Sequence, residues 1–292
     1  MHRSSPRPTP ALTGPCIQDL RRQMQTLLAG ISDTPRLEAE LLLAHVLQVD
    51  RSFLLREGSQ TVAPKIIEQL STQLSTRLAG RPLAYLLGHW AFWDLELAVS
   101  PAVLIPRPDT EILVESALQL LPAAFNGSIL DLGTGSGAIA LALARECPQA
   151  MVFAVDRSPR ALEVAQANGR ALGLAVNWLQ GDWFSPLPAD LRFDLIVSNP
   201  PYIAANDPHL NALQDEPLEA LISGPEGLDA LRHIIRTAPG YLKPGGHLLL
   251  EHGFEQGQAV RDLLRAAGYQ QTDTRPDLGG RARVSGGQLP QA

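Results

Sequence analysis

The residue types best suited to chemistry in this chain stand together at Asn199-Pro200-Pro201-Tyr202. They follow the apolar run Phe193–Ser198, which predicts a buried strand ending at the sheet edge where open α/β folds bind ligands. The Asn199 side chain and the proline carbonyls are hydrogen-bond acceptors, and proline has no N–H to compete as a donor. Tyr202 adds an aromatic face for a planar group or a cation. The pattern predicts a site for a planar amino group; the alternative is an ordinary Asn-Pro turn.

A second candidate site lies upstream, in a loop with the sequence Gly133-Thr134-Gly135-Ser136-Gly137, called here the glycine loop. A predicted strand over Ser128–Leu132 precedes it, and an apolar helical run over residues 138–145 follows it. Glycines allow unusual backbone angles and close approach of a ligand to the chain. A further predicted strand over residues 151–155 leads into Asp156, and a helix is expected to start at Ser158-Pro159. We expect Asp156 to bind ribose hydroxyls.

The glycine loop alone does not decide the cofactor. Read as Gly133-x-Gly135-x-x-Ala138 with an acid about twenty residues later, it also satisfies the dinucleotide fingerprint. A hydride-transfer enzyme, however, has no use for the amino-binding tetrapeptide downstream. A methyl donor is consistent with both segments.

Together, the two segments resemble a class I S-adenosylmethionine-dependent amino-methyltransferase. More narrowly, the chain resembles the release factor glutamine N5-methyltransferase (HemK/PrmC) family from about Leu20 to Val284. The narrower resemblance rests on Arg81-Pro82-Leu83-Ala84-Tyr85-Leu86-Leu87-Gly88, Leu104-Ile105-Pro106-Arg107-Pro108-Asp109-Thr110-Glu111, Asn206-Asp207-Pro208-His209-Leu210, Glu216-Pro217 and Lys243-Pro244-Gly245-Gly246. Two departures are small: the family often has Glu at Asp109 and more charge at His89-Trp90-Ala91.

The resemblance implies an α/β fold, namely a class I methyltransferase with a Rossmann-like, seven-stranded mixed sheet and a small N-terminal helical domain. The implied reaction moves a methyl group from S-adenosylmethionine to the side-chain nitrogen (N5) of the glutamine in the Gly-Gly-Gln motif of peptide-chain release factors. Two alternatives remain from other classes: a nucleic-acid adenine N6-methyltransferase, which shares the tetrapeptide, and a nucleotide-binding module without catalysis.

The resemblance also implies roles for individual residues. The catalytic and substrate-binding residues are Asn199, Pro200, Pro201 and Tyr202, with Arg107 as a further substrate contact. The cofactor-binding residues are Asp131, Gly133, Thr134, Gly135, Ser136, Gly137, Asp156, Asp182, Trp183 and Asn199. Asp182 is expected to accept from the adenine amine while Trp183 packs on the ring. Asp131 either holds the methionyl ammonium group or binds the amides of the glycine loop.

The loop before residue 112 has both a functional and a structural interpretation. In the family, Arg107, Asp109 and Glu111 lie where a wall closes beside the cofactor. The alternative is that Asp109 is a helix N-cap.

Composition and charge limit the partners. A net charge of −6 argues against a large, sequence-independent binding surface for a phosphate backbone, so nucleic acid is not expected as a partner. The two cysteines, Cys16 and Cys147, lack metal spacing, and the seven histidines show none, so no metal is implied. His233, His247 and His252 are interpreted as solvated or structural. No apolar run reaches membrane-spanning length, and a reduced, cytoplasmic setting is expected.

We expect four segments along the chain. Residues 1–18, with four prolines, are predicted to be a disordered tail, with a targeting segment as the alternative. Residues 19–80 show helical apolar spacing, as at Leu37, Leu41, Ala44 and Leu47, and are interpreted as a substrate-docking domain, with a purely stabilising cap as the alternative. Residues 81–101 are expected to form a strand pair linking the domains, with its aromatic residues in the core. Residues 102–292 form the methyltransferase domain.

The C-terminal segment contains Gly286-Gly287-Gln288, the tripeptide that surrounds the methylated glutamine in release factors. Residues 281–284 are predicted to be the final edge strand, which leaves residues 285–292 as a free tail. Such a tail spans at most about 28 Å, so it reaches its own site poorly. The hypothesis is that Gln288 is a weak substrate or competitor for another molecule of the same protein.

Overall fold

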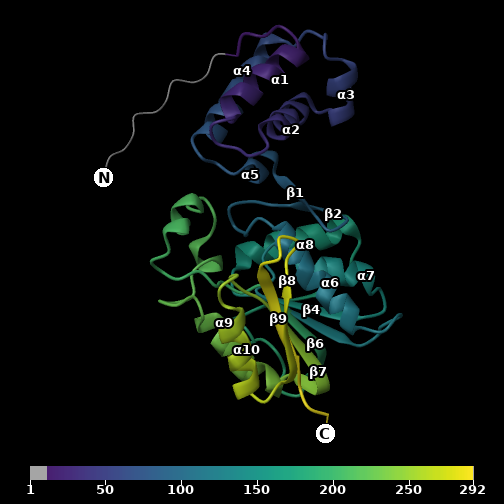
Figure 1. Ribbon diagram of the computed structural model, residues 1–292. Helices are drawn as coiled ribbons and strands as arrows, with labels where there is room; N and C mark the ends of the chain where they lie inside the picture. Colours follow the sequence, from purple (N-terminus) through teal and green to yellow (C-terminus); the bar gives the residue numbers. More distant parts are fainter. Residues whose placement is uncertain (1–11, 292) are drawn as a thin grey trace. The chain divides into compact units, whose positions relative to one another are not determined.

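The computed structural model describes residues 12–291 (Figure 1). The chain divides into two compact units, Met1–Gly88 and His89–Ala292. The predicted tail, residues 1–18, lies mostly outside the described residues. Its last part does not, because α1 begins at Ile17.

The described part of the first unit is helical. Its helices are α1 (Ile17–Leu28), α2 (Pro35–Leu47), α3 (Arg51–Arg56), α4 (Pro64–Leu78) and α5 (Leu83–Leu87). The core contains leucines from several helices, among them Leu20, Leu42, Leu43, Leu70 and Leu74. The predicted helical periodicity is confirmed, but the buried face of α2 lies over Leu42 and Leu43, whereas Leu37 is exposed.

A buried carboxylate links three parts of this unit. Glu40 of α2 is 4% exposed and accepts from Arg36 at 2.9 Å and Arg51 at 2.7 Å, with Arg21 of α1 at 3.4 Å. Burial opposes ionisation, yet the pKa of Glu40 is lowered because the arginines donate to it and attract its charge.

The second unit is built on a seven-stranded sheet with the order β5-β4-β3-β6-β7-β9-β8. Its strands are β3 (Ser128–Leu132), β4 (Met151–Asp156), β5 (Asn177–Gln180), β6 (Phe193–Ser198), β7 (Leu242–Glu251), β8 (Gln270–Pro276) and β9 (Ala282–Gln288). Strands β3 to β7 pair in parallel, and β9 is antiparallel to both β7 and β8. The expected seven-stranded mixed sheet is confirmed.

Helices cover both faces of this sheet (Figure 1). One core cluster joins Ile129, Leu195 and Leu249 to α6 (Glu111–Leu120) and α7 (Ala138–Glu146). The opposite cluster joins neighbouring strand residues, such as Leu130 and Ile196, to α9 (Asp229–Thr237) and α10 (Gly257–Ala266). Because successive strand side chains point to opposite faces, a strand with neighbouring apolar residues such as Ile129 and Leu130 of β3 has to be covered on both sides.

Two local predictions agree with the structure. Strands β1 (His89–Phe92) and β2 (Leu95–Ala98) form the expected antiparallel pair, with Phe92 and Leu95 buried. The predicted start of this segment at residue 81 is wrong, because Leu83–Leu87 form helix α5 and belong to the first unit, which ends at Gly88. Helix α8 (Pro159–Leu172) starts as expected, because the Ser158 hydroxyl accepts from the Ala161 amide at 3.2 Å.

The prediction for the C-terminal tail is wrong. Residues 282–288 form β9, which lies between β7 and β8, so it is not an edge strand and residues 285–288 are not a free tail. Gly286 and Gly287 are buried, and a Cβ atom on Gly286 would lie 2.4 Å from Leu249 Cδ2. The Gln288 amide donates to the Gly245 carbonyl at 2.9 Å. These glycines therefore provide close packing inside a sheet, which removes the basis for the hypothesis that Gln288 is a substrate.

Candidate active site

A cavity of about 370 Å³ lies at the carboxyl ends of the parallel strands. Every strand from β3 to β6 contributes residues at its carboxyl end: Gly133 and Gly135 after β3, Asp156 as the last residue of β4 with Ser158 after it, residues 181–183 after β5, and Asn199 with Pro201 after β6. The carboxyl ends of parallel strands meet at one edge of the sheet. The strand order reverses between β3 and β6, and doubly wound sheets bind their ligands at this point. The topology therefore brings together segments that the sequence scatters.

The glycine loop has the unusual backbone that its glycines permit. Gly133, Gly135 and Gly137 have φ values of 72°, 57° and 84°, in the left-handed region. The amides of Gly133 and Thr134 donate to the Val155 carbonyl at 2.9 and 3.0 Å. Nothing lies within 4 Å of a Cβ atom built on Gly135, so the backbone there faces open space. This geometry lets a ligand lie directly against the chain.

Asp156 joins the glycine loop to α8 while it lines the cavity. Its Oδ2 accepts from the Gly135 amide and its Oδ1 from the Ser158 amide, both at 2.9 Å. Burial raises the pKa of this carboxyl, and the amide donors and Arg157 offset part of the rise. Each carboxylate oxygen can accept a further hydrogen bond, so Asp156 remains able to bind ribose hydroxyls.

Asp131 lies beneath the glycine loop and does not line the cavity. It is fully buried, and its Oδ2 accepts from the Thr134 hydroxyl at 2.6 Å. Its Oδ1 has no hydrogen-bond partner among the described residues. Burial raises the pKa of Asp131 to about 7. An unpartnered buried carboxylate oxygen next to a cofactor loop suits a cationic group such as an ammonium.

Trp183 forms one wall of the cavity in a strained conformation. Its φ is +49°, which is unusual for a bulky residue. The local turn is held by Ser185, whose hydroxyl accepts from the Asp182 amide at 2.9 Å. The indole lies over Gly133, where an added Cβ would be 3.6 Å from the ring. Asp182 and Trp183 both line the cavity, as expected of adenine contacts.

The tetrapeptide Asn199–Tyr202 divides between the cavity and the interior. Asn199 and Pro201 line the cavity, whereas Pro200 and Tyr202 do not. The Asn199 Nδ2 donates to the Thr110 hydroxyl at 3.2 Å. The Tyr202 hydroxyl donates to Glu251 Oε1 at 3.2 Å, and burial raises the pKa of this phenol well above its usual range. The Tyr202 side chain therefore anchors the tetrapeptide from within.

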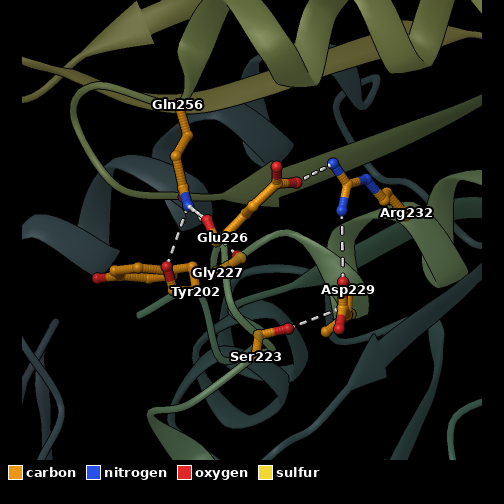
Figure 2. Close-up of polar contacts among 8 residues, drawn as sticks. Tyr202, Ser223, Glu226, Gly227, Asp229, Arg232 and Gln256 are labelled. Atoms are coloured by element: carbon orange, nitrogen blue, oxygen red, sulfur yellow. Dashed lines mark hydrogen bonds and ion pairs between the residues drawn. The ribbon is translucent and has the colours of Figure 1, made fainter. Parts of the chain in front are cut away.

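The backbone of Tyr202 is held by a loop contact shown in Figure 2. The Gln256 Oε1 accepts from the Gly253 amide at 2.9 Å, which directs its Nε2 to the Tyr202 carbonyl at 3.0 Å and the Gly227 carbonyl at 3.3 Å. Gly227 has a φ of +72°, and a Cβ atom there would lie 2.2 Å from the Tyr202 oxygen. Only glycine permits this approach.

The start of α9, which lines the cavity, is fixed by the same region (Figure 2). The Ser223 hydroxyl accepts from the Ala230 amide at 2.8 Å, and Arg232 pairs with the carboxylates of Glu226 and Asp229. These contacts hold residues 223–232 together, and Gln256 fixes the same segment through the Gly227 carbonyl.

Arg107 is engaged away from the cavity. Its guanidinium pairs with Glu216, whose Oε2 also accepts from the Ile105 amide at 3.2 Å. Arg107, Asp109 and Glu111 do not line the cavity; residues 102–104 of the same loop do. Asp109 is not the helix N-cap, because Thr110 occupies that position and Asp109 instead pairs with Arg283 at 3.0 Å. The arrangement makes Arg107 a support for the loop.

Several residues near the cavity were missed from the sequence. His233, interpreted as structural or solvated, lines the cavity with its ring 6.5 Å from that of Trp183. Thr110 and Gln256 contact the tetrapeptide from far along the chain. Thr110 lies inside the family segment quoted above, but no local pattern indicates Gln256. His252 is buried against Ser285 and is structural as expected.

Family models match both units of the chain. A model described as "Methyltransferase small domain" matches residues 109–267, and one described as "PrmC N-terminal domain" matches residues 19–88. A relative named release factor glutamine methyltransferase from Xylella fastidiosa is 50% identical over 90% of this chain and 97% of its own length. Relatives of the same name from Vibrio cholerae and Escherichia coli are 48% and 47% identical over 92% and 93% of this chain, and over 95% and 98% of their own. The chain belongs to the release factor glutamine methyltransferase family.

Solved structures agree with the fold. A Thermus thermophilus 16S rRNA N2 G1207 methyltransferase, in complex with AdoMet and guanosine, has a TM-score of 0.51 at 22% identity over 69% of this chain and 49% of its own. A Pyrococcus furiosus methyltransferase has a TM-score of 0.52 at 18% identity over 76% of this chain and all of its own. Both likenesses concern the class I methyltransferase fold, whose cofactor is S-adenosylmethionine.

Between residues 12 and 291, no helix is long and apolar enough to cross a membrane. Over the same range, no group of three or more His, Cys, Asp or Glu side chains is arranged to hold a metal ion.

Proposed function

We propose that this protein transfers a methyl group from S-adenosylmethionine to the side-chain amide nitrogen of the glutamine in the Gly-Gly-Gln motif of peptide-chain release factors. The observation that supports this best is Asn199, whose side chain lines the cavity while its NH₂ group is engaged by Thr110. Its carbonyl oxygen is thereby left to accept from an amino group. Family membership supplies the reaction class and the substrate.

The described residues fit the cofactor. The unpartnered Asp131 Oδ1 suits the ammonium, Asp156 the ribose, and the Trp183 wall the adenine. When bound, S-adenosylmethionine supplies an electrophilic methyl group on a sulfonium sulfur. We assign the positioning and activation of the substrate amide to residues of this chain.

Positioning is the main contribution of the tetrapeptide. An amide nitrogen is a poor nucleophile, since its lone pair is delocalised into the carbonyl. Two N–H bonds, donated to Asn199 Oδ1 and the Pro200 carbonyl, shift electron density onto nitrogen and fix the line of attack. Alignment of this kind is worth up to about 7–11 kcal/mol. The N-protonated product amide is strongly acidic and loses its proton to water, so no general base is required.

We further propose that the helical unit, residues 19–80 with α5, docks the release factor. It has its own core and lacks the cofactor segments, which all follow residue 88. The unpaired, buried cysteines Cys16 and Cys147 fit a reducing compartment, and we propose the cytoplasm.

The test is methylation of a purified release factor with labelled S-adenosylmethionine, followed by mass spectrometry of the glutamine. We expect Asn199→Ala to abolish most turnover while S-adenosylmethionine still binds, because it removes a transition-state contact. A rate within about threefold of wild type, under about 1 kcal/mol, would rule out the role of Asn199. Absence of label on the glutamine with the wild-type enzyme would refute the proposed function.

A further inference from the structure

The side-chain amide of Asn168 joins two segments that are distant from each other in the sequence. Asn168 lies in α8 and is 3% exposed. Its Oδ1 accepts from the Ala98 amide at 2.7 Å, and its Nδ2 donates to the Ala98 carbonyl at 3.0 Å and to the Ser136 carbonyl at 2.9 Å. Both N–H bonds of the side chain and its oxygen therefore have backbone partners.

These three backbone groups fit only one orientation of the side-chain amide. Exchange of the Asn168 oxygen and nitrogen would place the oxygen against two carbonyls and the NH₂ group against an N–H. Aspartate lacks the NH₂ group, and leucine, of similar size, has neither donor nor acceptor. A buried polar group that loses its partner costs more free energy than the hydrogen bond contributed. Asparagine is therefore the side chain that suits this position.

The two partners of Asn168 lead to different parts of the cavity lining. Ser136 follows Gly135 in the glycine loop, and Gly135 lines the cavity. Ala98 is the last residue of β2, and the chain that follows it lines the cavity at residues 102–104. Asn168 itself does not line the cavity, so it acts on both parts through their backbones.

The glycine loop depends on such contacts for its conformation. Its three glycines have positive φ values and place few limits on the backbone of the loop. The Val155 carbonyl and the Asp156 carboxylate accept from amides of residues 133–135. The Asn168 side chain holds the next residue, Ser136, by its carbonyl. A loop that is fixed before the cofactor arrives loses less conformational entropy on binding, which favours affinity.

We propose that Asn168 is a positioning residue for S-adenosylmethionine: its side-chain amide couples the β1–β2 pair to the glycine loop, so that each is better ordered when the other is fixed. β1 and β2 do not line the cavity. The direct routes for an effect of the cofactor on them are Asn168 and the chain through residues 99–104. Coupling is reciprocal, so loss of the Asn168 contact should weaken cofactor binding. The inference concerns the cofactor and goes beyond the choice of methyl acceptor.

Asn168→Asp tests the coupling with little change in shape. Aspartate keeps an oxygen for the Ala98 amide but has no NH₂ group for the two carbonyls. We expect titration calorimetry to give a dissociation constant for S-adenosylmethionine that is about tenfold higher, the equivalent of about one hydrogen bond. The matched control is Asn177→Asp, which removes an Nδ2 contact to the Val152 carbonyl at 3.1 Å, does not line the cavity and should leave the affinity unchanged.

A second control separates positioning from stability. Leu264→Ala truncates a fully buried side chain of α10 that does not line the cavity. We expect this variant to have lower thermal stability but wild-type affinity for S-adenosylmethionine at a temperature where it stays folded. Asn168→Asp should lose affinity under the same conditions.

Hydrogen exchange of the wild-type protein tests the coupling without a substitution. S-adenosylmethionine should slow the exchange of amides in residues 89–98 more than in β8, the edge strand of the sheet. In Asn168→Asp, saturating cofactor should still slow exchange in the glycine loop, but the additional slowing in residues 89–98 should be lost.

The inference fails if Asn168→Asp binds S-adenosylmethionine within about twofold of wild type. It also fails if the cofactor slows exchange in residues 89–98 of the wild type no more than in β8, and this result decides the question even where the variant does not fold. Persistence of the additional slowing in folded Asn168→Asp would show that residues 99–104 carry the effect, which would overturn the role of Asn168. These measurements need only the cofactor, so they are independent of whether the enzyme methylates a release factor.

Discussion

Replacement of Asp156 by asparagine tests whether this one side chain both shapes the glycine loop and binds the cofactor. In the structure, each carboxylate oxygen accepts one backbone amide, from Gly135 and from Ser158, at 2.9 Å. Asparagine has nearly the same shape but only one acceptor oxygen. One of the two amides must therefore face an NH₂ group, and one ribose hydroxyl loses a charged partner.

The size of the effect follows from these contacts. A hydrogen bond to a charged group contributes about 1.5–3 kcal/mol. Loss of one such contact to the ribose corresponds to a dissociation constant for S-adenosylmethionine that is about 10 to 100 times higher. Stability should change little, because the lost amide contact is offset by removal of a carboxylate whose pKa burial has raised.

Titration calorimetry with S-adenosylmethionine measures the affinity, and thermal unfolding of the ligand-free protein measures stability. Asp190→Asn is the matched control, because it removes an exposed carboxylate that does not line the cavity. If Asp156→Asn binds the cofactor within about twofold of wild type, the ribose assignment is wrong. If affinity falls only together with a large loss of stability, Asp156 is a structural residue.

Three further predictions follow. Gly227→Ala should reduce turnover strongly with little effect on S-adenosylmethionine affinity, because its Cβ would displace the Tyr202 carbonyl, 2.2 Å away; steady-state kinetics with a wild-type rate would contradict this. Glu251→Gln should gain stability relative to wild type between about pH 4.5 and about pH 7, because burial raises the Glu251 pKa from 4.5 to about 7 and wild type therefore loses stability as the buried carboxyl ionises beside Tyr202, Thr110, Asp109 and Arg283; melting curves with a constant gap would show that Glu251 does not titrate there. Removal of residues 1–88 should spare cofactor binding and raise KM for a release factor, while a short glutamine peptide is methylated at the same rate as by the full chain; an unchanged KM in a folded protein would exclude the docking role.

Much of the central architecture was predictable because its signals are local. The strand Ser128–Leu132, the glycine loop and the cap at Ser158 each depend on residue types within a few positions. The same holds for β6 and the tetrapeptide that follows it. These elements place Gly133, Gly135, Asp156, Trp183 and Asn199 at the cavity.

The rest depends on contacts between distant parts of the chain. Thr110 and Glu251 meet Asn199 and Tyr202 only because α6, β6 and β7 converge at one edge. The interior place of β9 was missed for a similar reason, since glycines in sequence are typical of loops and only the packing against Leu249 shows that they are needed in a strand. Arg107, expected at the substrate, is instead paired with Glu216 across a long separation in sequence.

The strand that contains Gly286-Gly287-Gln288 also bears on how such an enzyme avoids using its own Gln288 as a substrate. Gln288 pairs with His247, four residues before the end of β7, which places it about 13 Å from the catalytic edge along the strand. Its amide is already bonded to the Gly245 carbonyl. The tripeptide is thus present in every copy of the enzyme in a rigid form that cannot enter the cavity. A glutamine can therefore be selected only from a chain segment that is flexible enough to enter the cavity. The Gly-Gly-Gln sequence by itself does not make a substrate.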